Sequence, residues 1–253
     1  NSNNKFNIEI IKKIRKFPSD LFLRPFLTKS QLINDPYCTP PYWIKAQQNI
    51  QTSDNAIFLK THNAMCKLNG NLFTNEILSH AIIYIIRDPR DLVISNSYFT
   101  GNDFDKTISF MTSKKMVYRN SEHKKLYVPE FIGSWSFNYN SWNKTLITVP
   151  KIFIKYEDLL KNTTLEFKKV IEFLSKIINF RVDHKKIDMS VDLSKFDKLK
   201  KYEQKKGFIE SSDKNIFFRK GEKNQWKNQL SITQIKKIEK EFKKEMKFLG
   251  YLF

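Results

Sequence analysis

Residues Ala81 to Ile86 form an unbroken apolar run, Ala-Ile-Ile-Tyr-Ile-Ile, that ends abruptly at Arg87. The run is rich in β-branched residues and too short for a typical helix, so it predicts a strand buried on both faces, as in parallel sheets. Asp88 can cap a following helix, and Pro89 suits the first helical position. Such a strand end favours an anion site, because helix N-termini offer free N–H donors. The alternative is that Arg87 pairs with Asp88 or Asp91 and that the turn only connects two elements.

The rest of the chain alternates between strand-like and helix-like patterns. The patterns predict strands at 56–60 and 151–155, and helices at 5–16, from Pro41 to about Asp54, at 106–111, at 135–142 and from Ile235 to Leu249. Capping boxes that start helices are predicted at Thr163/Glu166 and at Ser231/Gln234. The segments between these elements are predicted to be irregular and proline-rich at 17–42, a loop at 67–77 with a turn at Asn69-Gly70, and helix with mobile loop at 183–216. Strands that alternate with helices indicate an α/β fold with a parallel sheet flanked by helices on both faces. The length favours a single domain over residues 1–253.

The composition is strongly basic, with Lys plus Arg 45 against Asp plus Glu 26 and a formal net charge of +19. Such an excess of positive charge favours anionic partners. The alternative is that the lysines are scattered and only keep the surface solvated. Nucleic-acid binding is an alternative that should weaken steeply with salt, but the chain lacks a recognised nucleic-acid motif, and we expect no such partner. Cys38 and Cys66 suggest no disulfide framework, and the scattered histidines lack the spacing of metal ligands, so we expect no metal. With no transmembrane run and no signal peptide visible, a reducing cytoplasmic setting is expected.

Polar residues follow each predicted strand. Lys60-Thr61-His62 ends the first strand, Arg87-Asp88 the second and Tyr156-Glu157-Asp158 the third. Because the carboxyl ends of parallel strands meet at one edge of a sheet, these residues indicate a site. His62 suits a general base near neutral pH, although a lone histidine is often only a hydrogen-bonded structural residue.

A basic loop supplies a further set of cations. Residues 217–227 read Phe-Phe-Arg-Lys-Gly-Glu-Lys-Asn-Gln-Trp-Lys. Arg219 and Lys220 followed by Gly221 allow side-chain cations and a closely approaching backbone N–H to bind one phosphate. Alone this motif is weak, because basic loops are common in so cationic a chain.

Taken together, these motifs resemble those of the cytosolic-type sulfotransferase family. The resemblance is carried in chain order by Lys60-Thr61-His62, by Arg87 with Ser95 eight residues later, by Gly133-Ser134-Trp135, by Tyr156-Glu157-Asp158, and by Arg219-Lys220-Gly221 with Trp226 and Lys227. It extends from about residue 56 to the C-terminus, and the motifs lie within 56–227.

The resemblance implies a single-domain, P-loop-NTPase-like sulfotransferase architecture. It implies transfer of a sulfuryl group from 3′-phosphoadenosine 5′-phosphosulfate (PAPS) to a small-molecule hydroxyl or amine acceptor, with adenosine 3′,5′-bisphosphate (PAP) as product. His62 would be the general base and Lys60 a second catalytic candidate. The implied cofactor contacts are Arg87, Ser95, Arg219, Lys220 and Gly221 at the 3′-phosphate, Tyr156 near the adenine, and Phe196 as a looser adenine match for which core packing is an equal alternative. Acceptor identity and oligomeric state are not readable from the chain.

One family feature is missing from the sequence. The family begins with a strand, a Pro-Lys-Ser-Gly-type loop and a helix that hold the 5′-phosphosulfate, and residues 1 to 55 carry no such loop. Because the sequence opens on Asn1, we expect upstream residues to supply it. The alternative is a catalytically impaired module that binds PAP but has lost the donor loop.

Overall fold

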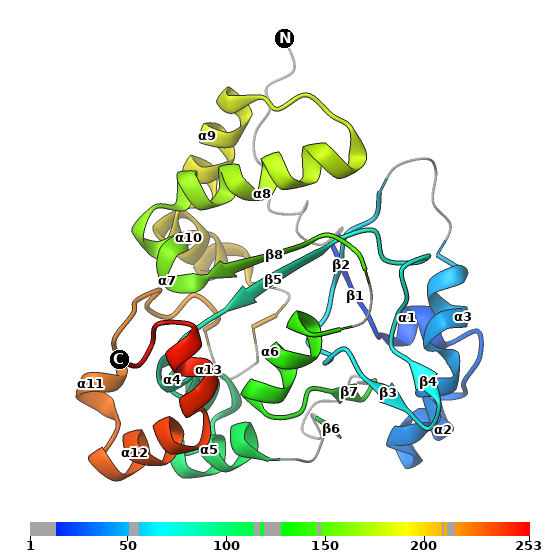
Figure 1. The fold of residues 1–253 in the computed structure, drawn as a ribbon, viewed down its shortest axis with the longest axis horizontal. Coiled ribbons are helices and arrows are strands. Elements are labelled where there is room, and N and C mark those ends of the chain that lie inside the picture. The colour runs from blue at the N-terminus through cyan, green and yellow to red at the C-terminus, as the bar shows by residue number, and fades with distance from the viewer. Residues whose placement is uncertain are drawn as a thin grey trace. The chain divides into compact units, whose positions relative to one another are not determined.

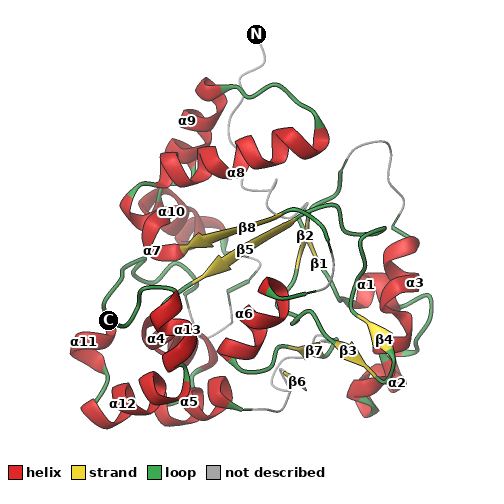
Figure 2. Ribbon diagram, in the orientation of Figure 1, coloured by secondary structure: helices red, strands yellow, loops and turns green. Residues whose placement is uncertain are grey.

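The structure is a computed structural model that describes residues 14–50, 56–113, 117–118, 128–145, 148–208, 210–211 and 216–253. The contacts between residues divide the chain into two compact units. The C-terminal unit contains Ile83–Thr112 and Lys151–Phe253, and the N-terminal unit contains residues 14–82 and Ser113–Pro150. Each unit is coloured along the chain in Figure 1 and by secondary structure in Figure 2.

The C-terminal unit is built on the strand pair β5 (Ile82–Ile86) and β8 (Lys151–Lys155). The two arrows run side by side in the same direction in Figures 1 and 2, so the pair is parallel as predicted. Its helices are α4 (Pro89–Thr100), α5 (Phe104–Thr112), α7 (Tyr156–Lys161), α8 (Thr163–Ile178), α9 (His184–Leu193), α10 (Phe196–Lys206), α11 (Trp226–Gln229), α12 (Ile232–Glu241) and α13 (Lys243–Phe248).

Helix α4 begins directly after β5. The Asp88 side chain caps it by accepting from the backbone N–H of Arg90 (2.9 Å), and Pro89 is its first residue. Both features agree with the sequence prediction. The helix ends at Gly101, whose φ of 73° is left-handed. The apolar core of this unit contains Ile86, Val93, Ile94, Ile108, Ile154, Ile238, Phe242 and Met246.

Three local predictions in this unit were wrong. Strand β5 is not buried on both faces, because Ile83 and Ile85 are 37% and 61% exposed. Helix α8 is capped by Asn162, which accepts from the Leu165 N–H, and not by a box at Thr163. The C-terminal helix is interrupted at Phe242 into α12 and α13, although the capping box of Ser231 is present as predicted.

The N-terminal unit contains short elements. They are β1 (Arg15–Lys16), α1 (Asp20–Leu23), α2 (Lys29–Asn34), α3 (Trp43–Gln48), β2 (Leu59–Lys60), β3 (Lys67–Leu68), β4 (Asn71–Leu72), β6 (Val117–Tyr118), β7 (Glu130–Phe131) and α6 (Trp135–Asn143). Strands β1 and β2 are parallel, whereas β3–β4 and β6–β7 are antiparallel. The predicted helix at 5–16 lies mostly outside the described residues, but its last two positions are strand β1. The loop predicted at 67–77 holds the β3–β4 hairpin, with Asn69-Gly70 in its turn as predicted.

Aromatic side chains form the core of the N-terminal unit. The fully buried Trp43 ring meets Phe73 and Phe131 edge-on, with centroids 5.3 and 5.5 Å apart. Phe17 and Trp142 extend the cluster on Phe73. Such edge-to-face pairs add to the stabilisation from apolar burial. This core fixes the ends of β2 and β7, which carry the polar residues of the unit.

Alternating strands and helices with parallel pairing confirm the α/β class. In the described part of the chain, no helix is both long and apolar enough to span a bilayer.

Candidate functional site

Arg87 lies at the end of β5, where the sequence predicts an anion site. Its guanidinium carbon is 4.4 Å from the centroid of the Tyr156 ring, and one Nη donates to the backbone oxygen of Glu222 at 2.9 Å. Glu222 directly follows Gly221 in the basic loop. The two carboxylates considered as partners in the alternative interpretation have other contacts, since Asp88 binds Arg90 and Asp91 binds the loop. The end of β5, the start of α7 and the basic loop therefore meet at Arg87.

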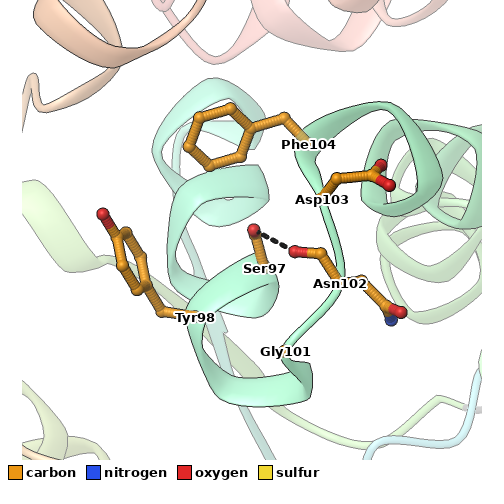
Figure 3. A pocket seen from close by; sticks show the side chains of 6 residues that line it. All are labelled: Ser97, Tyr98, Gly101, Asn102, Asp103 and Phe104. Carbon is orange, nitrogen blue, oxygen red and sulfur yellow. Dashed lines mark hydrogen bonds between the residues drawn. The ribbon is translucent and has the colours of Figure 1, made fainter.

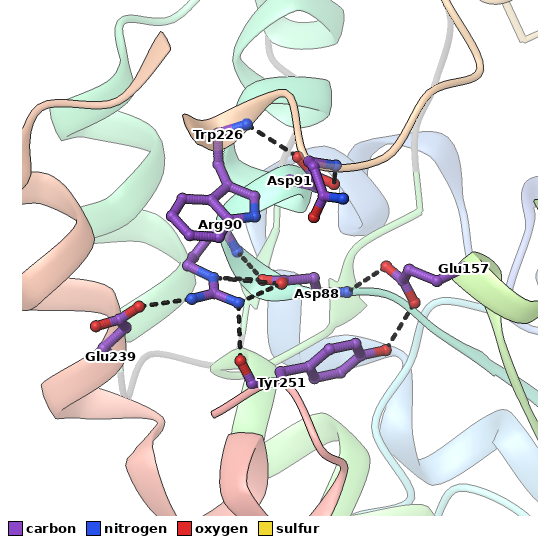
Figure 4. A network of polar contacts seen from close by, with 8 residues as sticks. Asp88, Arg90, Asp91, Glu157, Trp226, Glu239 and Tyr251 are labelled. Carbon is purple, nitrogen blue, oxygen red and sulfur yellow. Dashed lines mark hydrogen bonds and ion pairs between the residues drawn. The ribbon is translucent and has the colours of Figure 1, made fainter. Parts of the chain in front are cut away.

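Asp91 anchors the basic loop to helix α4. This carboxylate is 1% exposed and accepts two backbone N–H groups, from Asn224 at 2.6 Å and from Trp226 at 3.1 Å (Figure 4). From the other end of the loop, the buried Glu203 of α10 accepts the N–H groups of Phe217 and Phe218. Two buried carboxylates thus replace the hydrogen bonds that a sheet or helix would give this backbone.

We expect Asp91→Ala to loosen this loop. The change leaves two backbone N–H groups without their acceptor, which costs about 1–3 kcal/mol of unfolding free energy, and we expect PAP affinity to fall about tenfold, or about 1.4 kcal/mol. Thermal unfolding and calorimetric titration with PAP measure the two effects. Asp105→Ala, which removes an exposed carboxylate from α5, is the matched control. Equal PAP affinity in both variants would contradict the anchoring role.

Gly221 approaches the ring of Phe196 closely. Its φ is 65°, and a Cβ built there would lie 2.6 Å from the Cδ2 atom of Phe196. Phe196 is the first residue of α10, half-buried, and its ring also stands at 79° to that of Phe218. The structure therefore brings together two of the predicted cofactor contacts, and only glycine fits between the loop backbone and the ring.

Gly221→Ala should displace the Phe196 ring. Gly207→Ala is a matched control, because Gly207 has a similar φ of 71° but nothing within 4 Å of its built Cβ. Both variants place a Cβ at a positive φ, which costs about 1–3 kcal/mol, so both should unfold at a lower denaturant concentration. Only Gly221→Ala should weaken PAP binding, by about tenfold or about 1.4 kcal/mol. Equal PAP binding by the two variants would show that this close approach has no part in the site.

Arg219 lies on the same loop as Glu222. Its guanidinium carbon is 4.0 Å from the Tyr98 ring centroid, and an Nη donates to Gln225 at 2.7 Å. Tyr98 also lines a shallow hollow of about 410 Å³ at the end of α4 (Figure 3), formed by Ser97, Tyr98, Gly101, Asn102, Asp103 and Phe104. Lys220 is exposed, and Ser95 is half-buried within α4. The cations of the basic loop thus belong to the same unit as Arg87.

A buried polar network supports the strand ends that carry Arg87 and Tyr156 (Figure 4). Arg90 binds Asp88 and Glu239 and donates to the backbone oxygen of Tyr251 at 2.9 Å. Glu157 accepts the backbone N–H of Asp88 and the Tyr251 hydroxyl, both at 2.9 Å. Burial lowers the pKa of Arg90, but the hydrogen bonds and charges of its two carboxylates outweigh this and raise the pKa overall. The network joins the chain's C-terminal residues to both strand ends.

Tyr156 remains a neutral phenol beside Arg87. Burial raises its pKa, the nearby Arg87 charge opposes that rise, and the Glu157 and Asp91 carboxylates add to it. A neutral aromatic face under a guanidinium is a favourable cation–π arrangement.

His62 and Lys60 belong to the N-terminal unit. The His62 side chain is 48% exposed, and its Nδ1 lies 3.2 Å from Oε1 of Glu130. Glu130 is 4% exposed at its side chain and also binds the Lys16 ammonium at 2.6 Å. Burial raises the pKa of Glu130, but the hydrogen bond and charge of His62 and the ammonium of Lys16 outweigh it and hold the pKa below its ordinary value.

The backbone around His62 is tied to the segment that carries Glu130. Asn138 donates to the His62 backbone oxygen at 3.0 Å, and the Ala64 N–H donates to the Phe131 oxygen at 2.8 Å. The neighbouring Asn63 accepts the Phe131 N–H with its side chain. These bonds hold the end of β2 against β7.

The sequence did not single out Glu130, Glu203 or the anchoring role of Asp91. Each acts on residues far away in the chain, and no local motif marks such carboxylates. Within the described residues, no group of three histidine, cysteine or acidic side chains could hold a metal ion.

Residues 8–250 match the family described as "Sulfotransferase domain". The chain belongs to this sulfotransferase family. The match confirms the resemblance and begins at residue 8, well before the first motif at Lys60, so the short elements of the N-terminal unit are also part of the sulfotransferase domain.

Curated relatives and solved structures resemble the sulfotransferase domain over most of its length. It is 25% identical over 232 residues to Sulfotransferase 2A1 of Rattus norvegicus, covering 81% of this chain and 75% of that protein. It is 26% identical over 208 residues to Sulfotransferase 1B1 of Canis lupus familiaris, covering 79% and 64%. The crystal structure of retinol dehydratase with retinol and PAP superposes with a TM-score of 0.57 at 19% identity, covering 80% of this chain and 57% of that one, and is evidence for the fold alone. The chain thus spans between 57% and 75% of the length of these proteins.

Proposed function

We propose that this chain transfers a sulfuryl group from PAPS to the hydroxyl or amine of a small molecule. The observation that carries the proposal is the meeting of Arg87, Tyr156 and the basic loop, with the Arg87 guanidinium 4.4 Å from the Tyr156 ring and 2.9 Å from the Glu222 oxygen. Family membership and the PAP named in the retinol dehydratase complex support the same nucleotide.

The C-terminal unit fits the PAP end of the donor. Arg87 and Arg219 supply guanidinium groups suited to phosphate, Lys220 adds an exposed ammonium, and Gly221 lets the backbone approach closely. Tyr156 and Phe196 offer aromatic faces for the adenine, and Ser95 a hydroxyl. The residues present therefore match the chemistry of a phosphorylated adenosine. When bound, PAPS supplies the activated sulfuryl group.

We assign the proton transfer to the N-terminal unit. His62 takes the proton of the acceptor hydroxyl as the acceptor oxygen bonds to sulfur and the bond from sulfur to the leaving phosphate oxygen breaks. Lys60, two residues before His62, supplies a further positive charge that stabilises the negative charge developing on the leaving group. The retinol in the retinol dehydratase complex is an alcohol, which supports a small hydroxyl-bearing acceptor here.

A donor-consumption assay tests the proposal. Full-length protein is incubated with PAPS and separately with phenols, aliphatic alcohols, amines and sugars, and PAP release is followed. Release that depends on one acceptor class supports the proposal. The absence of release with every class, in protein that binds PAP, would reject transfer and leave nucleotide binding.

A second candidate function is a module that binds PAP but transfers no sulfuryl group, and the segment from β1 to α1 favours it. Strand β1, Pro18-Ser19 and helix α1 follow the element order of the family's donor loop, and β1 pairs in parallel with β2. The loop, however, has no lysine between Pro18 and Ser19, and Asp20 follows where the family has glycine. An aspartate there opposes an anionic phosphosulfate. Under this candidate the chain binds PAP and PAPS with similar affinity and consumes no donor.

A further inference from the structure

Outside the proposed nucleotide contacts, the buried carboxylate of Glu130 contacts two basic side chains, those of His62 and Lys16. Its Oε1 lies 3.2 Å from Nδ1 of His62, and its Oε2 lies 2.6 Å from the Lys16 ammonium. The Glu130 side chain is 4% exposed, whereas those of His62 and Lys16 are 48% and 37% exposed. A buried carboxylate thus supports an accessible imidazole.

The backbone fixes this arrangement independently of the side chains. The Phe131 N–H donates to Asn63 at 3.0 Å and the Ala64 N–H to the Phe131 oxygen at 2.8 Å, so the residues after His62 and after Glu130 are bonded to each other. Lys16 is held by the β1–β2 pair, where it stands opposite Lys60. The three side chains come from three strand ends that the fold holds together.

From this geometry we propose that Glu130 is a positioning residue that holds His62 in the Nδ1–H tautomer and turns Nε2 towards the acceptor. This inference rests on the proposed role of His62 as the base. A neutral imidazole has one N–H and one lone pair, and a carboxylate at Nδ1 draws the proton to that nitrogen. The lone pair is then on Nε2, which can take the acceptor's proton. The imidazolium that results is stabilised by the adjacent carboxylate, as in other carboxylate–histidine pairs.

Lys16 has a supporting role in this arrangement. Its ammonium keeps the buried carboxylate ionised, in line with the lowered pKa of Glu130. A protonated Glu130 would donate a hydrogen bond and would no longer favour the proton on Nδ1. The exposed part of the Lys16 side chain lets its ammonium reach water if Glu130 is replaced.

Histidine ring ¹⁵N chemical shifts of the full chain test the tautomer directly. The chain has four histidines, and His62→Gln identifies the His62 signals by their loss. At a pH where the ring is neutral, we expect Nδ1 of His62 to carry the proton in the wild type and Nε2 to carry it in Glu130→Leu. Glu76→Leu, at an exposed glutamate of the same unit, is the matched control and should leave the signals unchanged. A His62 ring that keeps the Nδ1–H tautomer in folded Glu130→Leu would overturn the proposal.

Kinetics provide a second readout. We expect kcat of Glu130→Leu to fall about 100-fold, with the acceptor KM and the PAP affinity each within about threefold of the wild type. Glu130→Gln keeps the side-chain volume, but its amide N–H can donate to Nδ1 and so place the ring proton on Nε2, and kcat should fall by about 100-fold or more. An unchanged kcat in Glu130→Gln would overturn the proposal even if Glu130→Leu does not fold. If the wild type transfers nothing, the proposed function fails, whereas the ¹⁵N shifts still decide whether Glu130 sets the tautomer.

Discussion

His62→Ala should lower kcat for sulfuryl transfer by about 100- to 10,000-fold, because general-base catalysis by a positioned histidine contributes on this order. The PAP affinity should stay within about threefold, since His62 belongs to the N-terminal unit and the proposed phosphate contacts belong to the C-terminal unit. The hydrogen bond from Asn138 to the His62 backbone oxygen does not involve the imidazole, so the local backbone should persist. Initial rates of PAP release and calorimetric titration with PAP measure the two quantities.

His80→Ala is the matched control for this experiment. His80 is exposed and lies in the same unit, so its loss removes an imidazole without touching the Glu130 pair. Its activity should equal that of the wild type. Substantial transfer by His62→Ala would assign the base to another residue, and a parallel loss of PAP binding would give His62 a structural role instead.

Arg87→Ala should weaken PAP binding by about 2–4 kcal/mol, which corresponds to roughly 30- to 1,000-fold in Kd. The guanidinium does two things that alanine cannot. It supplies charge for the phosphate, and it joins the Tyr156 ring to the Glu222 backbone across three segments of the chain. Its loss therefore removes a direct contact and releases the basic loop from the end of β5. Calorimetric titration of both proteins with PAP at one salt concentration measures the effect.

Arg181→Ala controls for the change in net charge, because Arg181 is an exposed arginine between α8 and α9. A general electrostatic effect would weaken PAP binding equally in both variants, and would decrease equally with salt. A loss confined to Arg87→Ala locates the phosphate at the end of β5. Equal affinities in Arg87→Ala and the wild type would contradict that placement.

Local signals predicted the elements that position Arg87. Asp88 and Pro89 mark the start of α4 because a capping carboxylate and a proline at the first position act within a few residues, and Ser231 with Gln234 marks the start of α12 in the same way. Such signals fail where neighbouring side chains compete. At the start of α8 the Asn162 side chain caps the helix in place of Thr163.

Long-range pairings could not be predicted. Glu130 and His62 are 68 positions apart, and Asp91 and Asn224 are 133 apart. No periodicity or local motif marks either pair, because the hydrogen-bond donors that contact each buried carboxylate come near it only when the chain folds. The exposure of Ile85 has a similar origin, since an apolar run indicates a strand but not which layers cover its faces.

The proposed function requires the C-terminal unit to recognise the 3′-phosphate of an adenosine nucleotide. The most direct test compares the affinities of the full chain for PAP and for adenosine 5′-monophosphate, which differ only in that phosphate. We expect PAP to bind the wild type at least about 100-fold more tightly, or about 2.7 kcal/mol, and this preference to fall below about tenfold in Arg87→Ala. Equal affinity of the wild type for the two nucleotides would contradict recognition of the 3′-phosphate.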